Sequence, residues 1–477
     1  MERILRRTYI DRIRPFMGGR NAKIITGIRR SGKTTILKEL PPYAADANIL
    51  AYDMELWTNR KYRDPDTLYQ SIKASLDPER NNMLVIDEVQ DIECWEELIR
   101  SLIAEDCCDI YLSGSNSKLL SGEFATYLGG RANTLEVCTL NLRECIMFNE
   151  RYGKEASDDA VLDKLFRRGG FPSVWVTDYE DSDAMSEVRD IIQSILMTDI
   201  VGRYGVKRVD VLERILMFLC DNIGNISSLN SIANALSSSG RGVHKDLVYE
   251  YAGYLEAACL VDRVETYDIK GKAILGSKYK YYLADVGIRN ALLGFRTSDI
   301  PGYIENIVYL ELKSRGYRVR VGSNGGREID FVAERNGELI YIQAAMALED
   351  ESTISREFGN LKGIADNYPK YVVVLNRGPL DTDVDGIICM GLKDFLLMDD
   401  LRRPSDPSDA QEANLLHRTL CRNIPRYPRE RRCRASWTVM PSTPGAPPLE
   451  TTCFKATSML SIEGNVSIGL SFTSFVL

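Results

Sequence analysis

The chain has 477 residues, of which 44% are hydrophobic and 27% charged, a composition that is ordinary for a globular protein of two to four domains. Its net charge of −8 excludes a protein that coats nucleic acid non-specifically, although a local basic surface is compatible with it. No apolar run reaches the roughly 18 residues needed to span a bilayer, and the N-terminus has no signal-peptide core. With 11 Cys in no CxxC pair and two His, we expect buried free thiols, no zinc site, no membrane partner and a cytoplasmic location.

The first 140 residues alternate short apolar runs with amphipathic segments. Residues 1–20 are predicted to form a lead-in helix whose buried side carries Ile4, Leu5, Tyr9, Ile13 and Phe16. Strands are expected at 23–27, 83–86, 109–112 and 134–137, and helices at 32–40 and 94–103. This alternation predicts an α/β fold with a parallel sheet covered by helices, in which ligands bind at the carboxyl ends of the strands.

The later segments follow a different plan. Residues 140–205 are predicted to be helical, with a turn at 169–172. Three helices at 212–219, 229–236 and 244–255, followed by strands at 261–264 and 280–283, predict a winged-helix unit. A helix at 304–315, strands at 318–321, 329–333 and 339–344, a further helix and a strand at 371–375 predict a separate small α/β unit. Residues 401–477 show no periodicity and are predicted to be a disordered tail, although a change of reading frame would leave the same composition.

A phosphate-binding motif stands between the first predicted strand and its helix. Residues 27–34 read GIRRSGKT and fit GxxxxGK[ST]. Its glycines allow successive backbone amides to face phosphate oxygens, and the helix N-terminus adds its dipole. Lys33 is predicted to reach the β- and γ-phosphates of ATP, and Thr34 to ligate Mg²⁺. The predicted nucleotide-binding residues are Gly27, Arg29, Arg30, Ser31, Gly32, Lys33, Thr34 and Thr35. The alternative is a glycine-rich turn with a surface lysine.

Polar residues follow the next two predicted strands. Asp87 is expected to hold Mg²⁺, and Glu88 to orient and deprotonate the attacking water. Ser115 or Asn116, after the following strand, is a candidate sensor of the γ-phosphate, although a plain turn explains the same residues. Arg131, after two glycines, is a candidate for stabilising transition-state charge in cis or from a neighbouring subunit; the alternative is a surface arginine.

The motifs GIRRSGKTTIL, LVIDEVQDI, YLSGSNSKLLS, LGGRANTLEV and GGFP occur in this order over residues 1–200. Together they resemble a widespread family of archaeal and bacterial AAA-type ATPases with a variable C-terminal half. YLADVGIRNALLG, YIENIVYLEL, GREIDFV and LIYIQAAMAL, over residues 205–400, resemble the winged helix and restriction-endonuclease-like domain attached to that ATPase. The resemblance implies a lead-in helix (1–20), an AAA-type ATPase domain with a helical lid (21–204), a winged helix (205–295), a degenerate nuclease-like domain (296–400) and the tail (401–477).

The nuclease-like segment lacks part of the expected catalytic set. Restriction-type nucleases place a carboxylate on one strand and a [DE]xK triplet on the next, where the carboxylates hold Mg²⁺. Asp330 and the helical Glu305 fit, but residues 343–345 read Gln-Ala-Ala in place of the triplet. We therefore expect a binding or docking module, with structural roles for Glu305 and Asp330 as the alternative.

The winged helix carries the best signal for double-stranded DNA. Its third helix has His244, Lys245, Tyr249 and Tyr251; the preceding loop has Arg241, and the wing has Lys270, Lys272, Lys278 and Lys280. Winged helices also bind proteins, so a protein partner is the alternative. The leading hypothesis is an ATP-hydrolysing switch acting on this C-terminal module. The others are a DNA-binding regulator or defence protein with a structural nucleotide, and an active ATP-dependent nuclease. An oligomer and a monomeric switch both fit.

Overall fold

The first part of the chain forms a parallel sheet. The computed structural model describes residues 4–44, 46–116, 127–153, 156–177, 179–226, 228–238, 243–348, 351–376 and 385–401. Within these ranges the sheet has the order β2-β3-β4-β1-β5 and every pairing is parallel. Its strands are β1 (Ala22–Thr26), β2 (Asn48–Asp53), β3 (Asn82–Asp87), β4 (Asp109–Gly114) and β5 (Ala132–Glu136). The predicted α/β class is confirmed. Edge strand β2 is half exposed and was not predicted.

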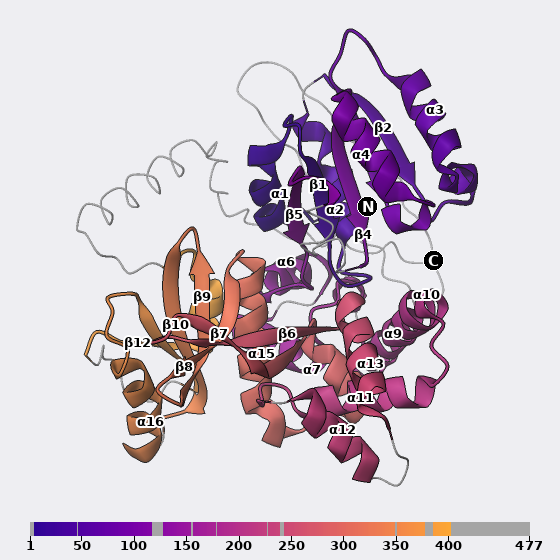
Figure 1. Cartoon of the computed structure of the whole chain (residues 1–477). Helices are drawn as coiled ribbons and strands as arrows, with labels where there is room; N and C mark the ends of the chain where they lie inside the picture. Colours follow the sequence, from indigo (N-terminus) through magenta and orange to yellow (C-terminus); the bar gives the residue numbers. More distant parts are fainter. Residues whose placement is uncertain are drawn as a thin grey trace, which may run out of the picture. The chain divides into compact units, whose positions relative to one another are not determined.

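Helices cover both faces of this sheet (Figure 1). They are α1 (Arg7–Ile13), α2 (Lys33–Glu39), α3 (Pro65–Ser75) and α4 (Trp95–Glu105). Apolar residues of α3 and α4 pack on one face, and those of α1 and α2 on the other. The predicted helix over residues 1–20 is shorter than expected, because α1 gives way to a 3₁₀ turn at Arg14–Phe16. Phe16 is therefore 44% exposed and not buried as predicted.

A group of helices follows β5, as predicted for residues 140–205. They are α6 (Leu142–Tyr152), α7 (Asp158–Arg168), α8 (Ser173–Val176), α9 (Asp181–Ser194), a π-helical turn (Ile195–Val201) and α10 (Gly202–Tyr204). The turn at Gly169 and Gly170 lies close to Asp285 and to the backbone of Leu140. A Cβ on Gly169 would lie 1.8 Å from Asp285 Oδ1, and one on Gly170 would lie 2.3 Å from Leu140 O, so only glycine fits at either place.

Three helices and a hairpin come next, in the order predicted. They are α11 (Val209–Asp221), α12 (Leu229–Ser238), α13 (Lys245–Ala257), β6 (Val261–Asp268) and β7 (Ala273–Leu283), followed by α14 (Val286–Leu293). β6 and β7 pair antiparallel, but β6 also pairs in parallel with β8. The hairpin is therefore part of a larger sheet.

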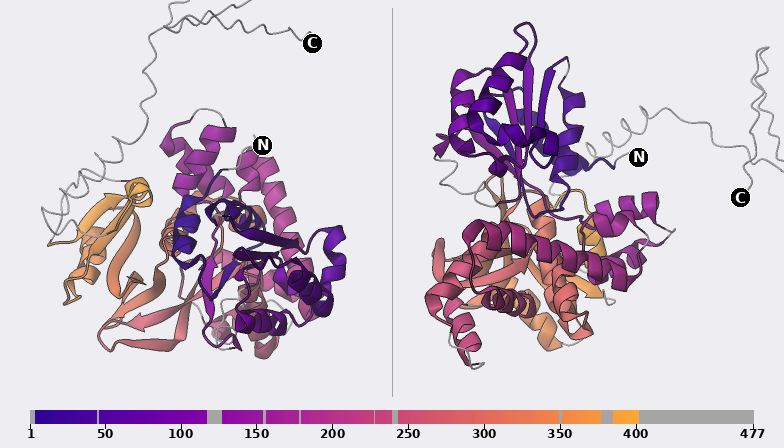
Figure 2. Two further views of the ribbon diagram at one scale, coloured as in Figure 1. Left: turned by 90° about the horizontal axis from the view of Figure 1, so that it is seen from above. Right: turned by 90° about the vertical axis from the view of Figure 1, so that its right-hand side faces the viewer.

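The remaining elements complete that second sheet (Figure 2). They are α15 (Ile300–Ser314), β8 (Arg318–Asn324), β9 (Arg327–Arg335), β10 (Glu338–Ala347), α16 (Glu351–Lys362), β11 (Lys370–Asn376), β12 (Ile388–Gly391) and α17 (Leu392–Leu397). Over the described ranges the strand order is β12-β11-β10-β9-β8-β6-β7. The predicted winged helix and the small α/β unit thus share one sheet. One apolar core runs from Ile28 through the helices after β5 to Leu401.

The described cysteines agree with the predicted free thiols. Those at positions 138, 145, 220, 259 and 389 are buried, and none of the cysteines in the described ranges forms a disulfide. No helix in these ranges has both the length and the apolar character needed to cross a bilayer. The predicted tail lies outside the described residues, apart from Leu401, which is buried.

Candidate nucleotide-binding site

The loop of residues 27–33, called the P-loop below, has the backbone geometry of a phosphate cradle. Gly27 has φ +139°, and a Cβ there would lie 2.2 Å from Val137 O. Gly32, with φ +96°, precedes the first residue of α2. Such left-handed conformations are open to glycine, and they turn successive amides of the loop inward. The two glycines of the motif are therefore required by the shape of the loop and not only by the sequence pattern.

Lys33 lies buried at the start of α2 and folds back over its own loop. Its Nζ donates to Gly27 O and Ile28 O, at 3.0 Å each. Burial lowers the pKa of Lys33, and the neighbouring carboxylates of Glu88 and Asp87 act in the opposite direction. A buried ammonium with two carbonyl partners has capacity for a third, anionic one.

Asp87 and Glu88 stand where β3 ends, at the same edge of the sheet. Asp87 accepts one short hydrogen bond from Ser113 and a further one from Thr34; burial raises its pKa, against the effect of these two donors. Glu88 has φ +54°, a strained conformation for a side-chain-bearing residue. Ser115 Oγ donates to Glu88 Oε1 at 3.2 Å, and Gln90 donates to its other oxygen. These contacts fix the direction of the Glu88 carboxylate.

The residues present fit a magnesium–nucleotide complex. Thr34 and Asp87 already meet through a hydrogen bond, so a hydroxyl and a carboxylate oxygen are together at one point. Mg²⁺ is usually held by one or two such protein oxygens plus phosphate and water, and does not need a cage of acidic residues. Ser31 Oγ is buried without a hydrogen-bond partner among the described residues. A buried orphan hydroxyl in a phosphate loop is explained by a ligand acceptor.

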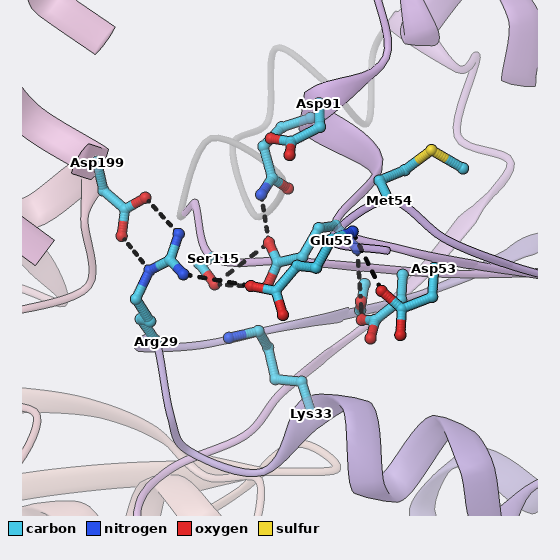
Figure 3. A network of polar contacts seen from close by, with 12 residues as sticks. Arg29, Lys33, Asp53, Met54, Glu55, Asp91, Ser115 and Asp199 are labelled. Atoms are coloured by element: carbon cyan, nitrogen blue, oxygen red, sulfur yellow. Dashed lines mark hydrogen bonds and ion pairs between the residues drawn. The ribbon is translucent and has the colours of Figure 1, made fainter. Parts of the chain in front are cut away.

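Arg29 extends from the P-loop toward two acidic residues (Figure 3). Its Nε and Nη2 donate to the two oxygens of Asp199, at 2.9 and 3.1 Å, and Nη1 reaches Glu55 at 3.4 Å. Asp199 lies in the π-helical turn and is 3% exposed. The hydrogen bond to Asp199 raises the pKa of Arg29, although burial opposes it. The sequence motif predicted Arg29 but gave no signal for Asp199 or Glu55.

Arg6 supports the P-loop from behind and was not predicted. It donates to both oxygens of Glu144, at 2.8 and 2.7 Å, to Ser31 O at 2.7 Å, and to two further carbonyls, Cys138 O and Thr139 O. Its side chain is buried. Glu144 also completes the capping box of α6. The only available sequence signal was an arginine directly before a buried helix face.

The other predicted site residues have different positions. Asn116 is buried at the carboxyl end of β4, where its backbone O accepts from Thr26 Oγ1 at 3.1 Å, but the residue that contacts Glu88 is Ser115. Arg131 comes directly before β5 and is exposed at the amino edge of the parallel sheet. The structure therefore does not bring Arg131 to the Lys33 site within one chain, because that site lies at the opposite edge. Of the remaining motif residues, Thr35 lies within α2 and Arg30 is exposed with φ +68°.

A separate cavity of about 420 Å³ lies at the amino edge of the same sheet. It is lined by the first residues of two strands, Asn82 and Asp109, and by Arg20 and Arg80. Nucleotides bind parallel α/β sheets at the carboxyl ends of the strands. This cavity is therefore distinct from the candidate nucleotide site.

The predicted nuclease residues are brought together, but around a lysine. Lys280 Nζ lies 2.6 Å from Glu305 Oε1, 2.5 Å from Glu328 Oε1 and 3.5 Å from Asp330 Oδ1, and its side chain is 2% exposed. Burial tends to lower the pKa of Lys280, but the three carboxylates outweigh it and raise the pKa. Gln343 accepts a long hydrogen bond from the Asp330 amide. A single internal ammonium thus offsets part of the negative charge of the three carboxyl groups.

This position corrects the predicted DNA-binding surface. Lys280 is buried and does not belong to an exposed basic wing. Tyr251 lies on the buried side of α13. Lys245, Lys270 and Lys272 are exposed, whereas exposed His244 pairs with Asp246. Arg241 lies outside the described residues, and so does the side chain of Lys278. The described positive charge on this surface is smaller than the sequence predicted.

Comparisons with known proteins agree with the geometry of the N-terminal half. Residues 19–146 match the model of an AAA domain, and residues 160–299 that of a domain of unknown function. An uncharacterized Haemophilus influenzae protein is 32% identical over 83% of this chain and 98% of its own length. A second uncharacterized protein, from Methanocaldococcus jannaschii, is 28% identical over 67% of this chain and 74% of its own length. The solved Walker-type ATPase of Pyrococcus abyssi aligns over 57% of this chain and 90% of its own, with 14% identity and a TM-score of 0.42.

Proposed function

Because the chain belongs to the same family as the Haemophilus protein and its residues 19–146 match the model of an AAA domain, we propose that it binds Mg²⁺ and ATP at Lys33 and hydrolyses the bond to the terminal phosphate. One observation carries this proposal. Lys33 and Thr34 from the P-loop and its helix, and Asp87 and Glu88 from β3, converge at one edge of the sheet. These are the residue types that phosphoryl transfer from ATP to water requires.

Each side chain has a defined task in the proposed reaction. Lys33 exchanges its two carbonyl contacts for phosphate oxygens and offsets the charge that develops on them. Thr34 and Asp87 would supply oxygens to hold Mg²⁺, whose charge would offset that of the phosphates. Glu88, held by Ser115 and Gln90, orients the attacking water and takes its proton.

We also propose that nucleotide turnover acts on the C-terminal module as a switch. Support comes from the apolar core, which includes Ile28 of the P-loop, the helices after β5 and the second sheet. We propose that the Lys280-centred cluster is structural and not a nuclease site. The buried Lys280 ammonium lies among the carboxylates that would have to hold Mg²⁺, and Ala345 stands where the triplet lysine is expected. Exposed Lys245, Lys270 and Lys272 favour a DNA-binding role for this module as the second candidate function.

The test is Mg²⁺-dependent ATP hydrolysis by the full chain, with and without double-stranded DNA. Lys33→Ala is expected to lose nucleotide binding, and Glu88→Gln to bind ATP without turnover. Lys38→Ala removes a half-exposed lysine from the same helix and should behave like the wild type. Stimulation by DNA, lost in a Lys245, Lys270 and Lys272 triple alanine variant, would support the DNA-linked role. ATP binding without turnover in the wild type would refute the hydrolase and leave a nucleotide-gated binding protein.

A further inference from the structure

Two cations of the P-loop enter the same space as two carboxylates. Figure 3 shows the Arg29 guanidinium between Asp199 and Glu55, with the Lys33 side chain in the same region. After burial, which lowers the pKa of Lys33, Glu88 has the largest opposing effect, and Arg29 lowers this pKa further by repulsion. Glu88 also raises the pKa of Arg29, after the effects of Asp199 and burial. Arg29 and Lys33 thus share the electrostatic field of Glu88, and both come from the loop that forms the candidate phosphate cradle.

The two edges of the Arg29 guanidinium are in different states. The edge made by Nε and Nη2 is fully engaged with Asp199 in a side-on, two-bond pair. Nη1, on the other edge, donates among the described residues to Glu55 alone, at 3.4 Å, which is longer than an ordinary hydrogen bond. One edge is therefore fixed by a buried partner while the other holds a weak, replaceable contact.

Glu55 is suited to be displaced. The Glu55 side chain is 61% exposed, so it has solvent to move into. Its partial burial, together with repulsion from Glu88, raises the pKa of its carboxyl group. A phosphate group arriving next to Arg29 would repel the Glu55 carboxylate and offer the guanidinium a more highly charged acceptor. Asp199 has no such freedom, because it is buried among core residues.

We propose that the Nη1 edge of Arg29 binds the terminal phosphate of ATP, and that Asp199 is the positioning residue that aims Arg29 at it. This inference rests on the proposed function and deepens it. ADP lacks the terminal phosphate, so Arg29 is a contact that only the triphosphate makes.

The proposal also identifies where the nucleotide state is communicated. Asp199 belongs to the π-helical turn Ile195–Val201, which joins α9 to α10. Its neighbours Ile195, Leu196 and Ile200 are buried in the core that extends to the second sheet. π-turns of this kind are frequently found at functional sites. A shift of the Arg29 side chain on phosphate binding would therefore act on Asp199 and, through the π-helical turn, on α9 and α10.

The test compares binding of fluorescent ATP and ADP analogues, with Mg²⁺, to the full chain. Arg29→Gln is expected to weaken ATP binding by about 10- to 100-fold, the value of one charged hydrogen-bond pair, and to leave ADP binding unchanged. Asp199→Asn should weaken ATP binding in the same direction, and the double variant should be no weaker than Arg29→Gln, because Asp199 acts through Arg29. Arg203→Gln, which removes an exposed cation of α10, is the control and should bind both like the wild type.

Three results would overturn the inference. Equal loss of ATP and ADP binding in Arg29→Gln, or no loss, would mean that Arg29 does not contact the terminal phosphate. Additive losses in the double variant, or loss of ADP binding in Asp199→Asn, would give Asp199 a general structural role. A wild type that binds neither nucleotide would remove the proposed function itself, whereas a wild type that binds both with an unchanged preference in Arg29→Gln removes only this inference.

Discussion

Arg6 is expected to determine both the stability of the N-terminal half and the shape of the P-loop. Its guanidinium makes hydrogen bonds to Glu144, Ser31 O, Cys138 O and Thr139 O, all buried. Arg6→Met keeps the aliphatic length but removes every donor, so the Glu144 carboxylate is left buried without a cation. Breaking a buried pair in this way costs about 3–5 kcal/mol.

Urea unfolding, followed by tryptophan fluorescence, measures that cost. Arg7→Met is the matched control, because Arg7 is the next residue, exposed on α1, and its loss should change stability by no more than about 0.5 kcal/mol. A double variant, Arg6→Met with Glu144→Leu, removes the unpaired charge and should recover most of the stability. It should still bind ATP more weakly than the wild type, since Ser31 O remains without its donor. Equal stability of Arg6→Met and Arg7→Met, or a double variant less stable than Arg6→Met alone, would refute this reasoning.

Three further predictions concern single residues. Lys280→Met leaves buried carboxylates without their cation and should cost about 3–5 kcal/mol in urea unfolding, whereas Lys272→Met, exposed on the same hairpin, should cost little; equal effects would contradict the assigned burial. Gly27→Ala places a Cβ 2.2 Å from Val137 O at φ +139° and should abolish ATP binding in a fluorescence titration, so wild-type affinity would show that the loop tolerates the change. Burial raises the pKa of Asp285 to about 6, so the native carboxyl keeps its proton between about pH 4 and 6, where the unfolded chain has lost it. Stability should therefore fall by up to about 3 kcal/mol as pH rises through that window, and Asp285→Asn should flatten this part of the profile; an unchanged slope would refute the link.

Sequence patterns predicted those elements whose signal lies within one short segment of the chain. The P-loop motif and the apolar strand before Asp87 each lie within one short segment, and the structure places them as expected. β2 was missed although its residues 49–52 (ILAY) form a short apolar run; its alternating exposure reflects its place at the edge of the sheet. Phe16 was assigned to a buried face because the helical period was continued through the 3₁₀ turn, which rotates the side chains that follow.

The rest depended on partners distant in the chain. Lys280 was taken for a surface lysine because lysine is rarely buried unless it is paired, and its partners come from α15 and β9. The bulge between Glu265 and Thr266 also breaks the period of two on the hairpin, so strand alternation does not indicate which face Lys280 occupies. Asp199 lies 170 residues from Arg29, and no local pattern marks it.

Two arginines connect the P-loop to the helices after β5: Arg29 of the loop pairs with Asp199, and Arg6, which donates to Ser31 O, pairs with Glu144 of α6. Both side chains of the Arg6–Glu144 pair are buried. A change of loop shape that separates them would leave a buried charge without a partner, which is strongly destabilising. Arg29–Asp199 is buried only on the Asp199 side, since the Arg29 side chain is 22% exposed. The loop is therefore held by a fully buried pair next to Ser31, whereas its contact through Arg29 is partly exposed and easier to rearrange. If Arg29 binds the terminal phosphate as proposed, the second pair is the one through which the nucleotide state would reach the helices after β5, because Arg29 is able to accept a new partner while it keeps Asp199.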